Sequence, residues 1–249
     1  VCCILFYSRN HRHSSKFYLM TVEDYKEGQV LLIDKPLEWT SFQVVNKVRW
    51  LLRKEFQLKK LKVGHAGTLD PLATGLLILC TGKFTKKIDT YQAQEKEYTG
   101  TITLGATTPS YDLETEIDQT FDISKITEAQ IHEATHQFIG EIEQQPPVFS
   151  ALKKDGKRLY EFARAGEDVE VPKRKITISA FEITTIEMPN VSFRVVCSKG
   201  TYIRSLAHDF GKALHNGAHL SALRRTKIGD FSVEDAVSIE NFENSFKNS

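Results

Sequence analysis

The sequence has few cysteines, no long apolar run and almost no net charge, and each shortage excludes a class of protein. Its four cysteines, with no C-x-x-C pair among 249 residues, are too few for a disulfide-stapled fold and indicate a reducing compartment, the cytoplasm. No run of about 18 apolar residues is present, so we expect no membrane-spanning segment. A net charge of +1 gives no overall attraction to nucleic acid, although it leaves room for a local basic face.

What the chain does contain is typical of a globular protein. Apolar residues make up 41% and charged residues 26% of the sequence, enough to offset the conformational entropy that a folded domain loses. The length suits one large domain or two small ones. A wholly disordered chain does not fit this composition.

Residues 1–19 differ from the rest of the chain, because they show neither a helical nor a strand period. Their charged side chains are all basic: Arg9, Arg12 and Lys16. The apolar stretch precedes these charges, which is the reverse of a secretory signal. The cysteines and histidines here do not match known zinc spacings: Cys2, Cys3, His11 and His13. We interpret residues 1–19 as an upstream extension before a natural start at Met20, which leaves a net charge of −2 on residues 20–249.

Apolar periodicity and turn residues predict helices and strands in irregular alternation. Strands are expected at residues 30–33, 75–80, 98–104, 176–186, 191–197 and 219–226. Helices are expected after Thr40, at 85–91, from Thr127 to Gly140, at 158–165 and at 203–214, with a loop at 144–157 and a frayed tail at 244–249. Residues 98–104 alternate between apolar side chains and threonines, which favours an antiparallel sheet. Because strands and helices do not alternate strictly, the pattern indicates the α+β class.

Several helix starts carry a residue that can cap the first turn. The expected caps, with capping-box partners where present, are Thr40 with Gln43, Thr127 with Gln130, Thr85 and Thr201. The helix after Thr40 has an apolar stripe that we expect to face the core. That stripe consists of Phe42, Val45, Val48 and Leu52.

The most informative segment is residues 64–75, Gly-His-Ala-Gly-Thr-Leu-Asp-Pro-Leu-Ala-Thr-Gly. Three glycines and a proline predict an irregular, tightly built loop just before an apolar strand. His65 and Asp70 are its side chains suited to proton transfer or nucleophilic attack. The residues alone fit a structural turn, with Asp70 accepting backbone hydrogen bonds, equally well. The spacing is not that of a P-loop, and a hydrolase that uses both residues would lack a triad or a water-activating metal.

This segment resembles the catalytic motif of the TruB family of tRNA pseudouridine synthases. Further matches at family spacing lie at residues 31–36, 40–41, 96–98, 150–161, 197–206, 217–220 and 223–225. The resemblance implies the pseudouridine synthase fold, an α+β fold whose central, mostly antiparallel mixed sheet is flanked by helices and carries an RNA-gripping insertion. It places the insertion at about residues 144–175 of a catalytic domain over residues 20–235. The C-terminal segment, residues 236–249, is too short for the additional RNA-binding domain of many bacterial members.

The resemblance implies an isomerase that flips uridine-55 out of the tRNA T arm and converts it into pseudouridine without a cofactor or metal. Asp70 is implied as the catalytic carboxylate, Arg204 as the guanidinium that keeps it ionised, and Asp112 as a second carboxylate on this arginine. The implied substrate-binding residues are Tyr98, which stacks on the base, Tyr202 and Leu223, which line the pocket, His65, which packs against the RNA, and Lys35, which supports the active-site wall. Without the motif, Arg204 would suit an exposed helix position and Tyr98 a core position.

Three basic groups can neutralise RNA phosphates, although each alone is typical of a solvated surface. Two flank the insertion: Lys153, Lys154, Lys157 and Arg158, and Lys173, Arg174 and Lys175. The third consists of Arg224, Arg225 and Lys227. The resemblance implies tRNA as the partner of a cytoplasmic monomer that needs no protein partner. The alternative is an RNA-binding module, a tRNA-folding chaperone that uses the same groove without catalysis.

Overall fold

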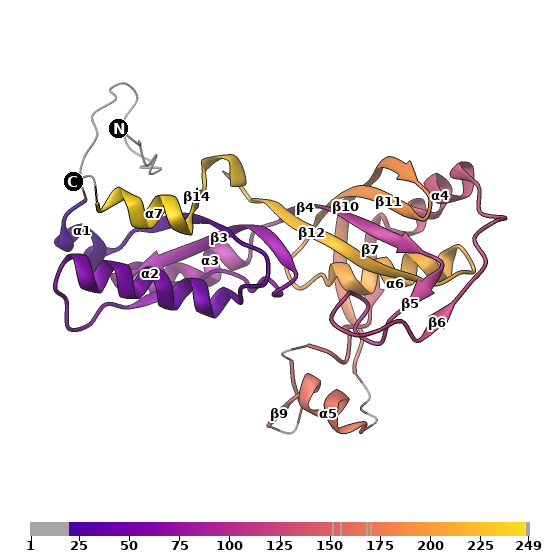
Figure 1. The fold of residues 1–249 in the computed structure, drawn as a ribbon, viewed down its shortest axis with the longest axis horizontal. Helices are drawn as coiled ribbons and strands as arrows, with labels where there is room; N and C mark the ends of the chain where they lie inside the picture. Colours follow the sequence, from indigo (N-terminus) through magenta and orange to yellow (C-terminus); the bar gives the residue numbers. More distant parts are fainter. Residues whose placement is uncertain (1–19, 151, 155, 168, 170, 248–249) are drawn as a thin grey trace. The chain divides into compact units, whose positions relative to one another are not determined.

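The computed structural model describes residues 20–247 except residues 151, 155, 168 and 170, so our interpretation of residues 1–19 lies outside the described residues. The chain forms two compact units. The first unit comprises the residues before Glu95 and those from Arg224 onward, and the second unit comprises Glu95–Leu223. Each unit has its own part of the β-sheet and its own helices (Figure 1).

The first unit is built on strands in the order β14, β1, β3 and the last residues of β12, with β2 on β3 and β13 on β12. The strands are β1 (Val30–Lys35), β2 (Val63–His65), β3 (Ala73–Thr81), β12 (Ala218–Ile228), β13 (Phe231–Ser232) and β14 (Val237–Ser238). The helices are α1 (Val22–Glu27), α2 (Ser41–Glu55), α3 (Ile88–Gln92) and α7 (Ile239–Ser245), with 3₁₀ turns at Gly82–Lys87 and Val233–Asp235. Strand β1 is parallel to β14 and antiparallel to β3.

The core of the first unit lies between α2 and the β1–β3 pair. Residues 76–80 of β3 are fully buried, as expected for a continuous apolar run in a central strand. The buried side of α2 consists of Val44, Val45, Val48, Leu51 and Leu52. Phe242 of α7 joins the same apolar cluster and is also fully buried. The C-terminal helix is therefore part of this core.

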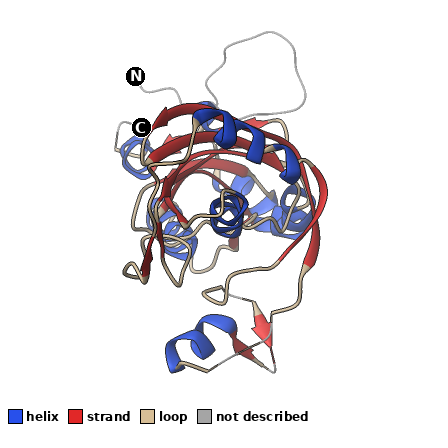
Figure 2. Ribbon diagram, turned by 90° about the vertical axis from the view of Figure 1, so that its right-hand side faces the viewer, coloured by secondary structure: helices blue, strands red, loops and turns tan. Residues whose placement is uncertain are grey.

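The second unit orders its strands β12, β4, β11, β10 and β7, and the β4–β11, β11–β10 and β10–β7 pairs are antiparallel. The strands are β4 (Lys96–Leu104), β5 (Ala106–Thr107), β6 (Gln119–Thr120), β7 (Gly140–Gln144), β8 (Lys153–Lys154), β9 (Lys157–Arg158), β10 (Arg174–Glu187) and β11 (Asn190–Cys197). The helices are α4 (Glu128–Ala134), α5 (Leu159–Ala165) and α6 (Ile203–Ala213), with a 3₁₀ turn at His136–Phe138. Helix α5 and the β8–β9 hairpin stand apart from the sheet of this unit (Figures 1 and 2).

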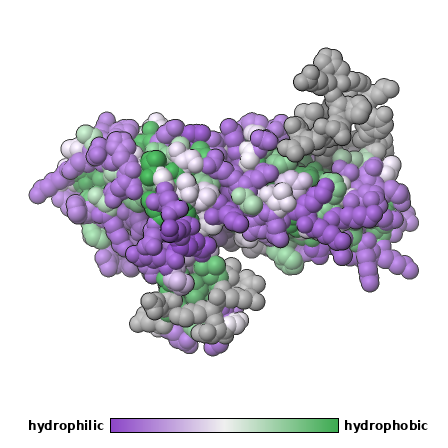
Figure 3. Space-filling view, turned by 180° about the vertical axis from the view of Figure 1, so that it is seen from behind, coloured by the Kyte–Doolittle hydropathy of each residue, from purple (hydrophilic) through white to green (hydrophobic). Residues whose placement is uncertain are grey.

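The predicted α+β class is confirmed: the sheet is mixed, since β1 and β14 are parallel whereas the β1–β3 and β4–β11 pairs are antiparallel. Both predicted capping boxes are present: the hydroxyls of Thr40 and Thr127 accept from the N–H groups of Gln43 and Gln130, and the threonine N–H groups donate to the glutamine side-chain oxygens. These features are local, so the sequence alone specifies them. None of the helices in the described part of the chain is long and apolar enough to cross a membrane. Hydrophilic residues cover most of the face in Figure 3.

Four local predictions are wrong. Phe42 is 62% exposed and not in the core, because Val44 and Leu51 take its place on the buried side of α2. Thr85 does not cap a helix, since its hydroxyl donates to the Gly82 carbonyl inside a 3₁₀ turn. Thr201 likewise donates to the Ser198 carbonyl and leaves α6 without a side-chain cap. The tail does not fray at residue 244, because α7 continues through Ser245.

Candidate active site

The Asp70 loop, residues 66–72, connects β2 to β3 and is tied to the first turn of α2. Ser41, the first residue of α2, accepts a hydrogen bond from the Leu69 N–H (2.8 Å) and donates one to the Leu69 carbonyl (3.1 Å). Both residues are buried. Asp70 is half-buried, and its carbonyl accepts from the Ala73 N–H at 3.0 Å, which closes a turn. One serine hydroxyl thus fixes the backbone just before Asp70.

Lys35 fixes the backbone just after Asp70. Its side chain is fully buried, and its ammonium donates to the carbonyls of Trp39 (2.6 Å), Pro36 (2.9 Å) and Pro71 (3.3 Å). The Glu38 N–H donates to the same Pro71 carbonyl at 2.8 Å. Lys35 therefore ties the backbone after Asp70 to the residues that follow β1.

Two pKa values around the loop are shifted. Burial lowers the pKa of Lys35 to about 8, the Asp70 carboxylate opposes this drop, and the Arg225 guanidinium adds to it. Burial also lowers the pKa of His65, and the charge of Arg225 lowers it further. At neutral pH His65 is therefore neutral, while most Lys35 side chains keep their charge.

Arg225 of β12 anchors the loop from inside the first unit. Its side chain is 1% exposed, with Nε donating to the Leu76 carbonyl (2.8 Å) and Nη2 to the Gly67 carbonyl (3.0 Å). A Cβ at Gly75 would lie 2.3 Å from the Arg225 carbonyl, so the strands can approach this closely only at a glycine. Our placement of Arg225 in an RNA-binding group is therefore wrong, because its guanidinium is inside the protein.

Arg224, its neighbour, is committed to an ion pair. Nη1 and Nη2 donate to the two carboxylate oxygens of Asp34 at 3.0 and 2.7 Å, a bidentate arrangement. Both side chains are partly exposed. Of the third predicted basic group, only Lys227 is fully on the surface.

In the second unit, Arg204 and Asp112 form a buried pair. Arg204 is the second residue of α6, and the side chains of Arg204 and Asp112 are 5% and 7% exposed. Nε of Arg204 lies 3.6 Å from Oδ2 of Asp112, and Nη1 donates to the carbonyls of Phe149 (2.9 Å) and Ser110 (3.3 Å). Asp112 also accepts from the Glu114 N–H at 2.9 Å. The guanidinium is therefore held in one orientation by several acceptors.

Tyr202 precedes α6 and is clamped by Gln144 at the end of β7. The Gln144 side chain accepts from the Tyr202 N–H (2.8 Å) and donates to the Tyr202 carbonyl (3.0 Å). The guanidinium carbon of Arg174 lies 4.9 Å from the centre of the tyrosine ring, within cation–π range. The insertion and α6 are thus linked through one aromatic ring.

Tyr98 and Leu223 lie on neighbouring strands, β4 and β12. Tyr98 is 8% exposed and pairs with Val195 across the β4–β11 ladder, while Leu223 is half-buried. The structure therefore places both predicted pocket residues in the sheet of the second unit.

The basic residues predicted to contact RNA are partly engaged within the protein. Lys173 is exposed, whereas Lys175 pairs with Glu141 at 2.9 Å. The ammonium of Lys157 lies 5.7 Å from the centre of the Phe162 ring. The backbones of Lys153, Lys154 and Arg158 belong to the β8–β9 hairpin, and their side chains lie outside the described part of the structure.

Sequence reasoning missed the supporting roles of Ser41, Gln144 and Arg225. Two signals pointed to Ser41: the family match at residues 40–41, and its position directly after an N-cap, which places the hydroxyl at a helix start. The contacts of Gln144 and Arg225 cross 58 and 149 sequence positions, so no local pattern could reveal them. Within the described part of the chain, no three His, Cys, Asp or Glu side chains are grouped as metal ligands would be.

Two family models match the chain. Residues 53–203 match the TruB family pseudouridylate synthase N-terminal domain, and residues 204–249 match the tRNA pseudouridylate synthase B C-terminal domain. A relative from Flavobacterium johnsoniae, tRNA pseudouridine synthase B, is 67% identical over 92% of this chain and 100% of its own length. The protein of the same name from Phocaeicola vulgatus is 57% identical over 88% of this chain and 93% of its own length.

Solved structures share the fold. A Cbf5–Nop10–Gar1 complex contains a chain that is 32% identical, with a TM-score of 0.66 over 88% of this chain. An H/ACA ribonucleoprotein bound to a substrate RNA containing 2′-deoxyuridine contains one that is 28% identical, with a TM-score of 0.64 over 96% of this chain. This chain spans only 54% and 61% of those two longer chains.

Proposed function

The chain belongs to the TruB family of pseudouridylate synthases, and on this premise we propose that it converts uridine-55 of the tRNA T arm into pseudouridine, with Asp70 as the catalytic carboxylate. The reaction breaks the bond between N1 of the base and C1′ of the ribose and forms a bond between C5 and C1′. C5 loses a proton and N1 gains one. Substrate and product are isomers, so the reaction needs neither a redox cofactor nor an energy source.

The way the Asp70 loop is held carries the proposal. Ser41 ties the residue before Asp70, and Lys35 ties the residue after it. These bonds hold the backbone on both sides of one half-buried carboxylate. A positioned carboxylate is what attack or proton transfer at a reacting uridine requires.

The second unit supplies the remaining proposed roles. We assign Arg204 to stabilise the ionised catalytic carboxylate, and Asp112, which it already contacts at 3.6 Å, to orient that arginine. Tyr98 stacks on the flipped base, and Tyr202 and Leu223 line its pocket. His65, neutral at pH 7, packs against the RNA where the base has left the stack.

The test is to map pseudouridine in a tRNA transcript after incubation with the protein, by mass spectrometry or carbodiimide labelling. The wild-type protein should convert uridine-55, and Asp70→Asn should reduce conversion by at least a thousandfold while tRNA still binds. Asp89→Asn is a matched control, since Asp89 is an exposed residue in the first turn of α3. Conversion by Asp70→Asn at the wild-type rate would refute the catalytic assignment.

The same variant separates catalysis from tRNA folding. A folding chaperone needs the binding surface but no carboxylate, so Asp70→Asn should leave tRNA refolding unaffected if that activity exists. Wild-type protein that refolds tRNA but forms no pseudouridine would favour the chaperone over the enzyme.

A further inference from the structure

Helix α2 and the loop after it carry a strongly basic surface that the proposed chemistry does not use. Residues 42–62 contain seven basic residues and one acidic residue, Glu55. We define the α2 basic face as Arg49, Trp50, Arg53, Lys54, Lys59, Lys60 and Lys62. Arg49 is half-buried and the other six are exposed. Helix periodicity places Arg49 and Arg53 one turn apart, and Trp50 and Lys54 one turn apart beside them, all outside the buried stripe of α2.

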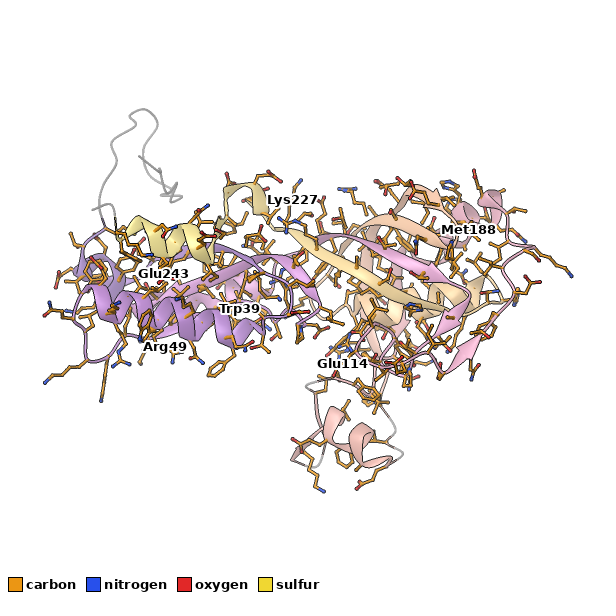
Figure 4. All side chains as sticks on the ribbon, in the orientation of Figure 1. Trp39, Arg49, Glu114, Met188, Lys227 and Glu243 are labelled. Atoms are coloured by element: carbon orange, nitrogen blue, oxygen red, sulfur yellow. The ribbon has the colours of Figure 1, made fainter. Side chains whose placement is uncertain are left out.

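Few carboxylates in the described part of the chain lie close enough to pair with the basic side chains of the α2 basic face. Within the described residues, Lys47 pairs with Glu243 of α7 at 2.8 Å, and the charge of Lys54 also acts on this carboxylate, but no carboxylate forms an ion pair within 4 Å of any charged member of the α2 basic face. Arg49 donates to the Val63 carbonyl (3.3 Å), and Arg53 donates to the Leu58 carbonyl (3.2 Å). These bonds orient the guanidinium groups without neutralising them. Figure 4 shows Arg49 on this helix.

An exposed aromatic ring lies within the same surface. Trp50 is 50% exposed, and the ammonium groups of Lys47 and Lys54 lie 5.1 and 5.0 Å from its ring centre. An exposed indole flanked by lysines offers a base a ring to stack on, beside ammonium groups that can bind phosphates. A nucleic acid therefore fits this surface better than an acidic protein segment does.

The α2 basic face lies on the same helix that holds the Asp70 loop. Ser41, which holds Leu69, is the first residue of α2, and the helix continues for 15 residues from there. At about 1.5 Å per residue, Lys54 lies roughly 20 Å along the helix from Ser41. An RNA whose target base reaches Asp70 can therefore extend its backbone along this helix.

We propose that the α2 basic face binds the phosphate backbone of the tRNA beyond the target base. The inference rests on the proposed function, because it needs a tRNA at Asp70. It gives the enzyme a second RNA-contact surface, separate from the insertion and contained in the first unit. It also explains how a chain of net charge +1 attracts RNA, since its positive charge is concentrated locally.

The test compares two double variants in tRNA binding at several salt concentrations. Lys54→Gln with Lys60→Gln removes two exposed charges from the face. Lys26→Gln with Lys83→Gln removes two charges from the same unit that already pair with Glu23 (3.5 Å) and Glu27 (2.8 Å). The first variant should bind more weakly and reduce the slope of log K against log salt by about 1.8, or about 0.9 for each phosphate contact. The control variant should keep the wild-type slope.

Fluorescence locates the contact independently of affinity. The chain has two tryptophans, so Trp39→Phe leaves Trp50 as the sole reporter. Its emission should change on addition of a tRNA transcript and should be unaffected by anionic phosphatidylserine vesicles. Unchanged emission with tRNA, or identical salt slopes in both double variants, would overturn the inference, as would a response to the vesicles alone. Absence of pseudouridine with the wild-type protein would instead count against the proposed function.

Discussion

Ser41 shows how much a single residue contributes to the candidate site. Its hydroxyl satisfies both backbone groups of Leu69, and Ser41→Ala would leave a buried N–H and a buried carbonyl without this partner. We expect a loss of about 1–3 kcal/mol in the free energy of unfolding. We also expect kcat/KM for pseudouridine formation to fall by roughly ten- to a hundredfold, because Asp70 loses its fixed position.

Thr21→Ala separates these two effects of the serine. Thr21 caps α1 through a capping box, and its loss should cost about 1 kcal/mol of stability without touching the Asp70 loop. Urea denaturation and initial rates of Ser41→Ala and Thr21→Ala would separate the loss of stability from the loss of activity. An equal loss of activity in the two variants would show that Ser41 acts only through stability.

Lys35 makes stability depend on pH in a defined window. Its pKa falls to about 8 in the folded protein from an ordinary value of 10.5, so the unfolded chain binds more protons between these values. Stability therefore rises with pH across that window, by about 3 kcal/mol in total, as the buried ammonium loses its charge. Lys35→Met should lack this rise.

Denaturation midpoints from pH 7 to 11 would measure the contribution of Lys35. As the pH increases, the denaturation midpoint of the wild type should rise relative to that of Lys35→Met. Parallel curves for the two proteins would contradict the shifted pKa.

At the scale of elements, α2 shows what a local pattern can and cannot predict. The capping box at Thr40 and Gln43 is formed by residues three positions apart, and it is present as expected. The predicted apolar stripe was right at Val45, Val48 and Leu52 but wrong at Phe42. An apolar residue in the first turn can lie at the edge of a core, and only the partner surface decides whether it is covered.

The two ends of this stripe should respond differently to truncation. Leu52→Ala should cost about 2–5 kcal/mol, because Leu52 is fully buried in the core of the first unit. Phe42→Ala should change stability by no more than about 0.5 kcal/mol, because Phe42 is 62% exposed. Thermal and urea unfolding of the two variants would measure the difference, and similar losses would place Phe42 in the core.

At the scale of the molecule, the C-terminal segment belongs to the first unit. Phe242 is fully buried in the cluster that contains α2 and β1, although almost 190 residues separate it from Leu52. Phe242→Ala should cost about 3–5 kcal/mol. The Phe42→Ala variant is the matched comparison. If Phe242→Ala lost as little stability as Phe42→Ala, α7 would not support the core.

The sequence could single out candidate residues for the site, but it could not reveal the contacts that hold them. The motif at residues 64–75 singled out Asp70 and His65 because few side chains there can carry chemistry. Lys35 was identified only through family resemblance, and its three carbonyl contacts depend on how β1 and the loop come together. Arg225 resembled a surface charge, yet the pairing of β12 with β3 buries it.

The sequence by itself determined the α+β class, the two capping boxes, the motif loop and, through its motifs, the family. Each of these depends on residues close together in the chain or on a pattern of motifs. Tertiary structure alone decided which arginines are inside, which face of α2 is covered and where the C-terminal helix packs. Those outcomes depend on contacts between distant segments, and burial of a given side chain is set by what packs against it rather than by its own type.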